Sequence, residues 1–165
     1  MKNHLRVEIA FLLMAVCRLA VGQAQYDEQA HLFQIKPQFY SAFQFNEGLA
    51  EVRIGKFPNG KYGFIDQNGN FVINPMYEAV SWFSEGLAAV RIGDAKTGKW
   101  GYINKKGITV IPHKFSNIES SLNTVGDFHE GLAYIRIGQG EDKKDGYIDK
   151  TGKVVIPPQF HWAYN

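Results

Sequence analysis

The stretch FSEGLAAV, residues 83–90, decides the fold of this 165-residue chain, because its core Glu-Gly-Leu-Ala occurs three times. The copies begin at Glu47, Glu85 and Glu130, so the successive offsets are 38 and 45 residues. Self-similarity at such a period is typical of arrays in which one supersecondary unit stacks on the next. The seven extra residues of the longer offset lie between Ile118 and Phe128, around the polar stretch 119–124, which we expect to be a surface loop.

Three short apolar runs follow the glycine of each Glu-Gly-Leu-Ala core. In the middle unit they cover residues 87–92, 100–103 and 109–111. In the first run Ala88, Val90 and Ile92 form an entirely apolar face, as the period of two in a strand requires. Asn104 and Gly107 bracket a turn, and Pro112 ends the third run because it has no N–H to donate. Each unit is therefore predicted to be a three-stranded antiparallel meander. The linking stretch, with apolar residues three apart, fits one turn of helix or an irregular crossover.

The predicted fold is all-β: an open array of about three antiparallel three-stranded β-meander repeats over residues 35–165. The units cover about 35–72, 73–110 and 111–155, with a partial unit at 156–165. A propeller-like arrangement is the alternative, although a closed propeller needs four or more blades. The partial unit is either a cap or the start of a further repeat.

The N-terminus has the pattern of a secretory signal peptide over residues 1–24, followed by an N-terminal segment at 25–34. Lys2 and Arg6 precede an apolar run at 9–17, and small residues precede a cleavage site after Ala24. The run is too short to span a bilayer. We therefore expect an exported protein, periplasmic or extracellular, with no stable membrane insertion after cleavage.

The composition, 45% hydrophobic and 21% charged, is typical of a globular protein and argues against disorder or several membrane spans. The formal net charge is +2, and it falls to zero when the signal peptide is removed. This charge gives no reason to expect a nucleic-acid partner. Cys17 leaves with the signal peptide, so no thiol remains to mispair in an oxidising compartment.

The repeated pattern, residues 83–90 with Lys99-Trp100-Gly101-Tyr102-Ile103, resembles the bacterial WG-repeat family, also called KWG repeats. The resemblance extends from Ile35 to the C-terminus. Tyr62 and Asp145 stand where the family has tryptophan. The family is defined by a repeat, so the resemblance implies a binding or interaction module, often exported, and no particular chemistry.

Motifs for catalysis or cofactor binding are absent from the sequence: it has no phosphate loop, no nucleophile elbow and no His-Glu-x-x-His. Asp66, Asn68 and Asn70 alternate like the start of a calcium loop, but a hairpin turn accounts for them equally well. The histidines have no metal-ligand spacing; they are His31, His113, His129 and His161. We therefore expect no enzyme activity, no cofactor and no metal site.

Two periodic features are candidate ligand contacts. Arg53, Arg91 and Arg136 share one phase of the first strand and form either an anion-binding strip or ion pairs with acidic residues of an adjacent unit, such as Glu47, Glu85 or Glu130. The neutral mature chain favours ion pairs. The aromatic residues Trp82, Trp100 and Tyr102 either pack between repeats or form a platform for sugar rings, and packing is favoured.

The functional hypothesis is a non-enzymatic exported repeat module for protein–protein interaction at the bacterial envelope, with an unidentified protein as partner. The alternative is glycan or peptidoglycan binding through the repeat aromatics.

Overall fold

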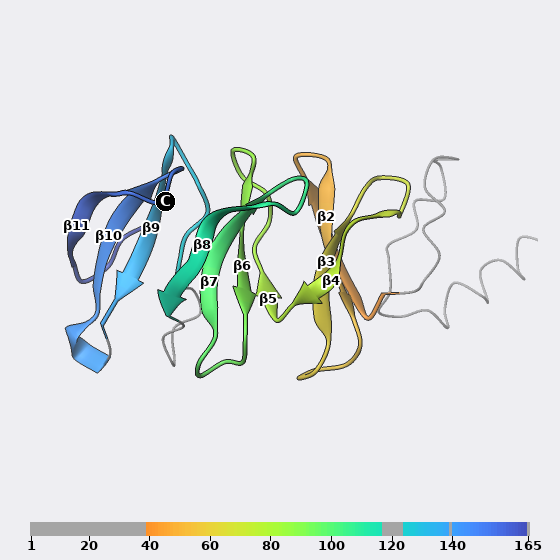
Figure 1. Cartoon of the computed structure of the whole chain (residues 1–165), viewed down its shortest axis with the longest axis horizontal. Helices are drawn as coiled ribbons and strands as arrows, with labels where there is room; N and C mark the ends of the chain where they lie inside the picture. The colour runs from red at the N-terminus through yellow and green to blue at the C-terminus, as the bar shows by residue number, and fades with distance from the viewer. Residues whose placement is uncertain (1–38, 117–123, 139, 165) are drawn as a thin grey trace, which may run out of the picture.

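The computed structural model describes residues 39–116, 124–138 and 140–164, which form three antiparallel sheets that follow one another along the long axis of the molecule (Figure 1). The expected signal peptide and the segment at 25–34 lie outside the described residues, as does most of the loop at 119–124. Within the described ranges, no helix is long and apolar enough to cross a membrane. The all-β open array is confirmed.

The first sheet has the strand order β1-β2-β3-β4, the second β5-β6-β7-β8 and the third β11-β10-β9. The strands are β1 Ser41–Asn46, β2 Leu49–Ile54, β3 Lys61–Ile65, β4 Phe71–Tyr77, β5 Ala79–Val80, β6 Leu87–Ile92, β7 Lys99–Asn104, β8 Thr109–Ser116, β9 Leu132–Ile137, β10 Lys144–Asp149 and β11 Val154–Phe160. A 3-10 turn at Gly140–Asp142 separates β9 from β10.

The link between the first and second sheets is extended through β5 and has no regular structure at residues 81–83, so the helical-turn alternative was wrong and the irregular crossover describes part of the link. One residue, Glu78, separates β4 from β5, and its N–H donates to the carbonyl of Arg91 at 3.1 Å. Ser81 N–H then donates to the Ala89 carbonyl at 2.8 Å. The extended path pairs these N–H groups along the edge of β6, where a helical turn would leave that edge without a partner. The first two sheets thus have four strands each.

The Glu-Gly pair at the start of each repeated core is a two-residue hairpin turn. Glu47 and Gly48 join β1 to β2 with φ values of 50° and 87°. Glu85 and Glu130 also have φ 50°. Two successive positive φ values are typical of the tight turns that match the strand twist, but glutamate pays a steric cost there that glycine avoids. At Glu47 and Glu85 the side-chain carboxylate compensates this cost by accepting a hydrogen bond from a backbone N–H of the next unit.

The middle sheet is buried on both faces. Ala88 and Val90 pack in the core shared with the first sheet, whereas Ala89 packs in the core shared with the third. The sequence had indicated only the first of these as a continuous apolar face. Small and β-branched side chains on both faces let the sheets stack closely.

Equivalent aromatic pairs join successive units. Phe64 of the first sheet meets Phe83 at a ring-centroid distance of 4.8 Å, and Tyr102 of the second meets Phe128 at 5.0 Å. Both pairs are edge-on, the geometry that the charge distribution of aromatic rings favours. These four aromatic residues are therefore used for packing between units.

Candidate functional site

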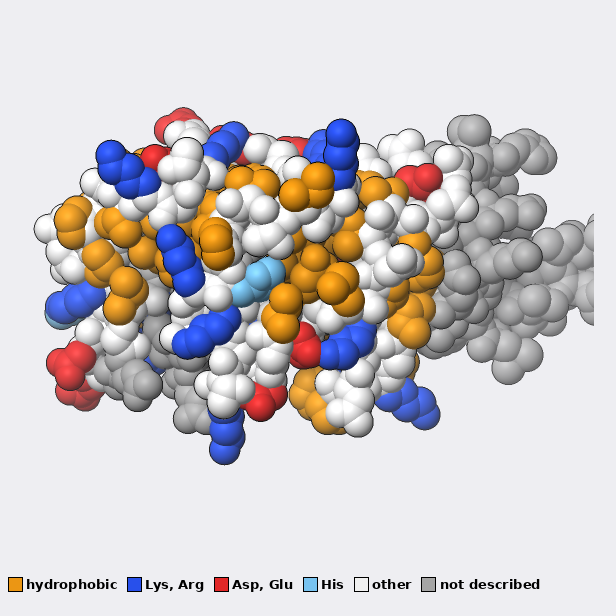
Figure 2. Space-filling view, in the orientation of Figure 1, with side chains coloured by type: hydrophobic (Ala, Val, Ile, Leu, Met, Phe, Trp, Pro, Cys, Tyr) orange, Lys and Arg blue, Asp and Glu red, His pale blue; other side chains and the backbone are white. Residues whose placement is uncertain are grey.

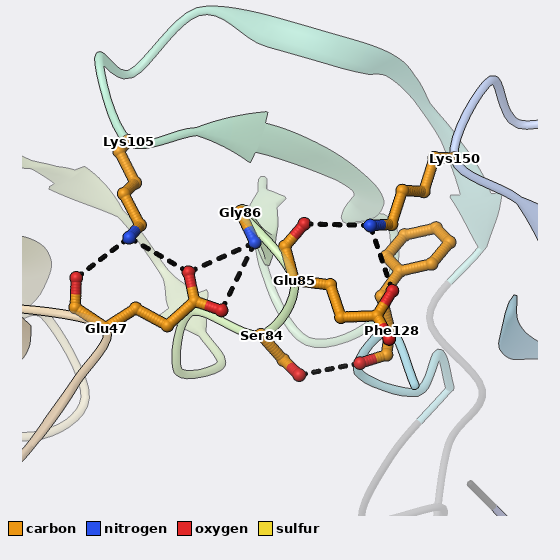
Figure 3. A network of polar contacts seen from close by, with 7 residues as sticks. All are labelled: Glu47, Ser84, Glu85, Gly86, Lys105, Phe128 and Lys150. Carbon is orange, nitrogen blue, oxygen red and sulfur yellow. Dashed lines mark hydrogen bonds and ion pairs between the residues drawn. The ribbon is translucent and has the colours of Figure 1, made fainter. Parts of the chain in front are cut away.

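Successive units are joined by a contact that we call the turn clasp (Figure 3). The Glu47 carboxylate accepts a hydrogen bond from the Gly86 backbone N–H at 3.1 Å and pairs with Lys105 Nζ at 3.0 Å. Lys105 Nζ also donates to the Glu47 carbonyl oxygen at 2.9 Å. The Glu-Gly turn of one unit thus holds the Glu-Gly turn and a hairpin lysine of the next.

The second clasp repeats the first with equivalent residues. Glu85 accepts from the Gly131 N–H at 3.0 Å and pairs with Lys150 Nζ at 2.9 Å. Ser84 Oγ donates to the Phe128 carbonyl at 2.6 Å beside it (Figure 3). The hydrogen bond from Lys150, followed by that from Gly131, lowers the pKa of Glu85. The clasp therefore favours the ionised form of Glu85.

Arg53 and Arg91 each lie over an aromatic ring of their own unit. Arg53 lies opposite Tyr62 across the strand pair, and Arg91 lies opposite Trp100. The Arg53 guanidinium carbon is 5.6 Å from the Tyr62 ring centroid, and that of Arg91 is 5.7 Å from Trp100. Arg53 is only 8% exposed. Glu47 and Glu85 bind lysine and backbone N–H instead, so the expected pairing of the arginines with these two glutamates was wrong. The guanidinium groups lie over the cross-strand rings.

Arg136 has a different partner because Asp145 replaces the aromatic residue. The two side chains form a bidentate pair with distances of 2.6 and 2.7 Å, and Asp145 is fully buried. The Trp162 ring lies 5.0 Å from the Arg136 guanidinium carbon, and Asp145 also accepts from the Ala163 N–H at 2.9 Å. The C-terminal segment thus supplies the ring that position 145 lacks.

The three aromatic candidates from the sequence differ in exposure. Tyr102 is completely buried and donates its hydroxyl to the Gly126 carbonyl at 2.7 Å, and burial raises its pKa. Trp100 is 9% exposed, whereas Trp82 is 50% exposed. Trp82 is therefore the one of these three that offers a ring to a ligand.

Trp82 lines a cavity of about 510 Å³. Glu51 on β2 and Asp127, just before β9, contribute carboxyl groups to the same cavity, and Ser81 and Tyr134 contribute hydroxyls. Burial and the nearby charge of Asp127 raise the pKa of Glu51 to about 7. Burial likewise raises the pKa of Asp127, and a hydrogen bond with Ser81 partly offsets this rise. Two carboxyl groups beside an accessible indole form a site that accepts hydrogen bonds or positive charge.

Sequence reasoning missed Glu51 and Asp127. Glu51 occupies the repeat position of Ala89, and Asp127 occupies that of Trp82. The sequence did contain a signal for both residues: each places a carboxyl group at a repeat position where another unit has a non-acidic residue. The two residues come from different units, so the stacking was needed to show that they share a cavity.

Asp66 has a structural role in its turn. Its carboxylate accepts from the backbone N–H groups of Asn70 and Asn68, both at 2.9 Å, and these bonds lower its pKa although desolvation opposes them. In the part of the chain that the structure describes, no group of three or more His, Cys, Asp or Glu side chains is placed to hold a metal ion.

An apolar band crosses the array on the outer edge strands (Figure 2). Val72 on β4, Val110 on β8 and Val155 on β11 occupy equivalent repeat positions and are 43%, 40% and 50% exposed. Each of these strands is the last at its edge of a sheet. We call these three residues and their exposed neighbours the valine band; the neighbours are Phe71, Met76, Ile108, Val154 and Phe160.

A family model described as "WG containing repeat" matches residues 35–56, 62–94, 100–140 and 146–165. The second match runs from β3 through β6, so one repeat of the family contributes to two sheets. Comparisons with curated proteins and with solved structures gave no match.

Proposed function

The chain belongs to the WG containing repeat family, and from that premise we propose that it is a non-enzymatic, exported module that binds a partner protein at the bacterial envelope. The observation that supports this proposal is the valine band. Its three valines recur at one repeat position and stay exposed in all three sheets. Recurrent exposed apolar surface along an array is a feature of protein-binding surfaces.

The position of the band suits an extended segment of a partner. β4, β8 and β11 lie at sheet edges, where backbone N–H and C=O groups remain available for an added strand. Valine side chains beside such an edge add apolar contact area to those hydrogen bonds.

Export is supported by the signal-peptide pattern at 1–24, and the absence of cysteine after residue 17 suits an oxidising compartment. Non-enzymatic function is supported by the lack of catalytic motifs in the sequence. Fusion of residues 1–24 to a reporter tests export: the reporter should leave the cytoplasm with a new N-terminus after Ala24. A reporter that stays inside the cell contradicts this part of the proposal.

The binding surface is tested by capture from envelope extract with residues 25–165 as bait. We expect the triple variant Val72→Asp, Val110→Asp, Val155→Asp to lose a protein that the unmodified bait captures. The matched control places aspartate at another recurrent exposed position, with Ile54, Ile92 and Ile137 substituted; their exposures are 38%, 47% and 51%. Equal capture by both triple variants contradicts the valine band as the binding surface.

Glycan binding is the second candidate, because Trp82 presents a half-exposed ring at the cavity. Sedimentation with isolated peptidoglycan tests it. Binding that is lost in Trp82→Ala and kept in Trp162→Ala favours this candidate, since Trp162 is exposed but stacks on Arg136 outside the cavity.

A further inference from the structure

The Arg53 guanidinium is a buried charge whose donors are incompletely used. The residue is 8% exposed, and its Nε and Nη2 atoms are fully buried without a hydrogen-bond partner among the described residues. None of the ion pairs within residues 39–116, 124–138 and 140–164 includes this arginine. A buried charged group that loses its hydrogen bonds to water and gains none in return is costly for the folded state.

Aromatic rings surround this guanidinium without satisfying its N–H groups. The guanidinium carbon lies 5.2 Å from the ring centroid of Tyr40, 5.5 Å from that of Phe57 and 5.6 Å from that of Tyr62. The face of a ring attracts the positive charge. The N–H groups, however, donate in the plane of the guanidinium, as a fork that matches the two oxygens of a carboxylate.

The third unit shows which group binds this edge of the guanidinium. Arg136 has the repeat position of Arg53, and it donates from the same two atoms, Nε and Nη2, to the Asp145 carboxylate at 2.6 and 2.7 Å. The Trp162 ring lies over the same guanidinium, so a ring and a carboxylate are compatible at one arginine. In the first unit Tyr62 occupies the position of Asp145. That unit therefore supplies the rings but not the carboxylate.

The loop after the arginine strand differs in charge between the first two units. Hydrogen bonds from Thr97 and Lys96 lower the pKa of Asp94 in the second unit, and the charge of Arg91 lowers it further. Lys56, which is exposed, occupies the position of Asp94 in the first unit. A second cation in place of a carboxylate makes the first unit the one that attracts an anion.

The rings leave the site within reach of a ligand. Phe57 lies in the loop between β2 and β3 and is 80% exposed, and Tyr40 is 44% exposed. The Phe57 side chain has little burial to lose, so we expect it to move aside when a ligand enters. The two rings then offer apolar surface beside the charge.

We infer that Arg53 binds the carboxylate of a ligand through Nε and Nη2, with the carbon atoms next to that carboxylate lying against the rings of Tyr40 and Phe57. The arrangement is that of Arg136 with Asp145, except that the carboxylate comes from another molecule. It can belong to the C-terminus of a peptide or to an acidic side chain. The probes Nα-acetyl-phenylalanine and Nα-acetyl-aspartate methylamide distinguish these two sources.

Titration calorimetry of residues 25–165 at pH 7 tests the inference. We expect at least one of the two carboxylates to bind, and the corresponding uncharged amides not to bind. Binding should weaken about tenfold or more in Arg53→Gln and in Arg53→Lys, because an ammonium lacks the planar fork. Arg91→Gln, the same substitution in the second unit, should bind like the unmodified chain. Thermal melting of each variant shows whether it is folded.

A self-pairing variant adds a readout that a purely structural arginine would not produce. Tyr62→Asp places in the first unit the residue type that pairs with arginine in the third. The new carboxylate should occupy Arg53 and weaken ligand binding about tenfold or more, whereas Tyr62→Phe keeps a ring and should retain binding. The bound carboxylate should raise the melting temperature of the unmodified chain and of Tyr62→Phe, but not that of Tyr62→Asp.

The inference is wrong if neither carboxylate binds at millimolar concentration, if the uncharged amides bind as well as the acids, or if folded Arg53→Gln keeps full affinity. Tighter binding of inorganic phosphate than of both carboxylates would also contradict it, because the site would then select another anion. The capture experiment with the valine variants does not depend on Arg53, so the two proposals can fail separately.

Discussion

The Glu85 carboxylate accepts a hydrogen bond from the backbone N–H of Gly131 at 3.0 Å, and Gly131 is the second residue of the next unit's own Glu-Gly turn. The turn that shapes one unit is therefore also the contact that positions the following unit. This relationship explains why glutamate occupies a position with φ 50°, where glycine would be less strained.

Substitution of these glutamates by glycine should separate the effect of turn strain on stability from the contribution of the clasp. Glu130 has the same φ of 50° as Glu85, but no following Glu-Gly turn lies within the described residues. We expect Glu130→Gly to stabilise the protein by roughly 0.5–1 kcal/mol, because it relieves left-handed strain. Glu85→Gly should melt at a lower temperature than Glu130→Gly, because it also loses Lys150 and Gly131. Identical melting temperatures would mean that the clasp contributes nothing.

Removal of one partner of the buried Arg136–Asp145 pair should strongly destabilise the protein. Asp145→Ala leaves a guanidinium that is about 10% exposed without its carboxylate. We expect a loss of about 3–5 kcal/mol in the free energy of unfolding, measured by urea denaturation. The double variant with Arg136→Ala should lose less than the sum of the two single variants. Strict additivity would contradict a coupled pair.

The pH dependence of stability should report the Glu51 carboxyl. Its pKa is raised from 4.5 to about 7 in the folded protein, so the folded state binds more protons than the unfolded state between these values. Stability must therefore fall as the pH rises through this window, by roughly 1–3 kcal/mol in total. Glu51→Gln should be more stable than the unmodified chain at pH 8 and should lack this contribution. A constant difference between the two proteins from pH 4.5 to 8 would show that Glu51 does not titrate in this way.

Two turn glycines should tolerate alanine to different degrees. Gly48 has φ 87° with open space where a Cβ would lie, whereas Gly152 has φ 80° and a Cβ there would be 2.8 Å from Ile111 Cγ2. Both substitutions incur left-handed strain of about 1–2 kcal/mol. Gly152→Ala should cost about 1–3 kcal/mol more, because it also overpacks the contact with the preceding unit. Equal unfolding free energies would mean that Ile111 moves aside freely.

Truncation of two neighbouring aromatic residues should destabilise the protein to very different degrees. Phe83 is 2% exposed and meets the Phe64 ring, whereas Trp82 is 50% exposed. Phe83→Ala should cost about 3–5 kcal/mol through lost burial and a cavity between units. Trp82→Ala should cost less than about 1 kcal/mol, which leaves it usable as a folded binding variant. Chemical denaturation of the two variants measures the difference.

Several details of the fold could be read from local sequence. Asn104 and Gly107 bracket the turn between β7 and β8, as their types predict, and Gly107 has φ 76°. The extended link through Glu78 could not be read in this way, because its apolar spacing also fits a helical turn. Only the pairing of Glu78 and Ser81 with β6 decides between the two.

The candidate site was even less accessible to sequence reasoning. Trp82 and Trp100 have the same side chain, yet one is half exposed and the other is nearly buried. The arginine partners were misjudged because the order of the strands, and not sequence distance, places Tyr62 beside Arg53.

The sequence by itself determined the repeat, the all-β class and the turns, because a period and a turn depend on residues that are close along the chain. Tertiary structure alone decided the turn clasps, the burial of both faces of the middle sheet and the cavity of Glu51 and Asp127. These features join residues of different units; Lys150, for example, donates to the Glu85 carbonyl across 65 positions. The rise and rotation from one sheet to the next determine such contacts, and both emerge only when the cores between the sheets are packed.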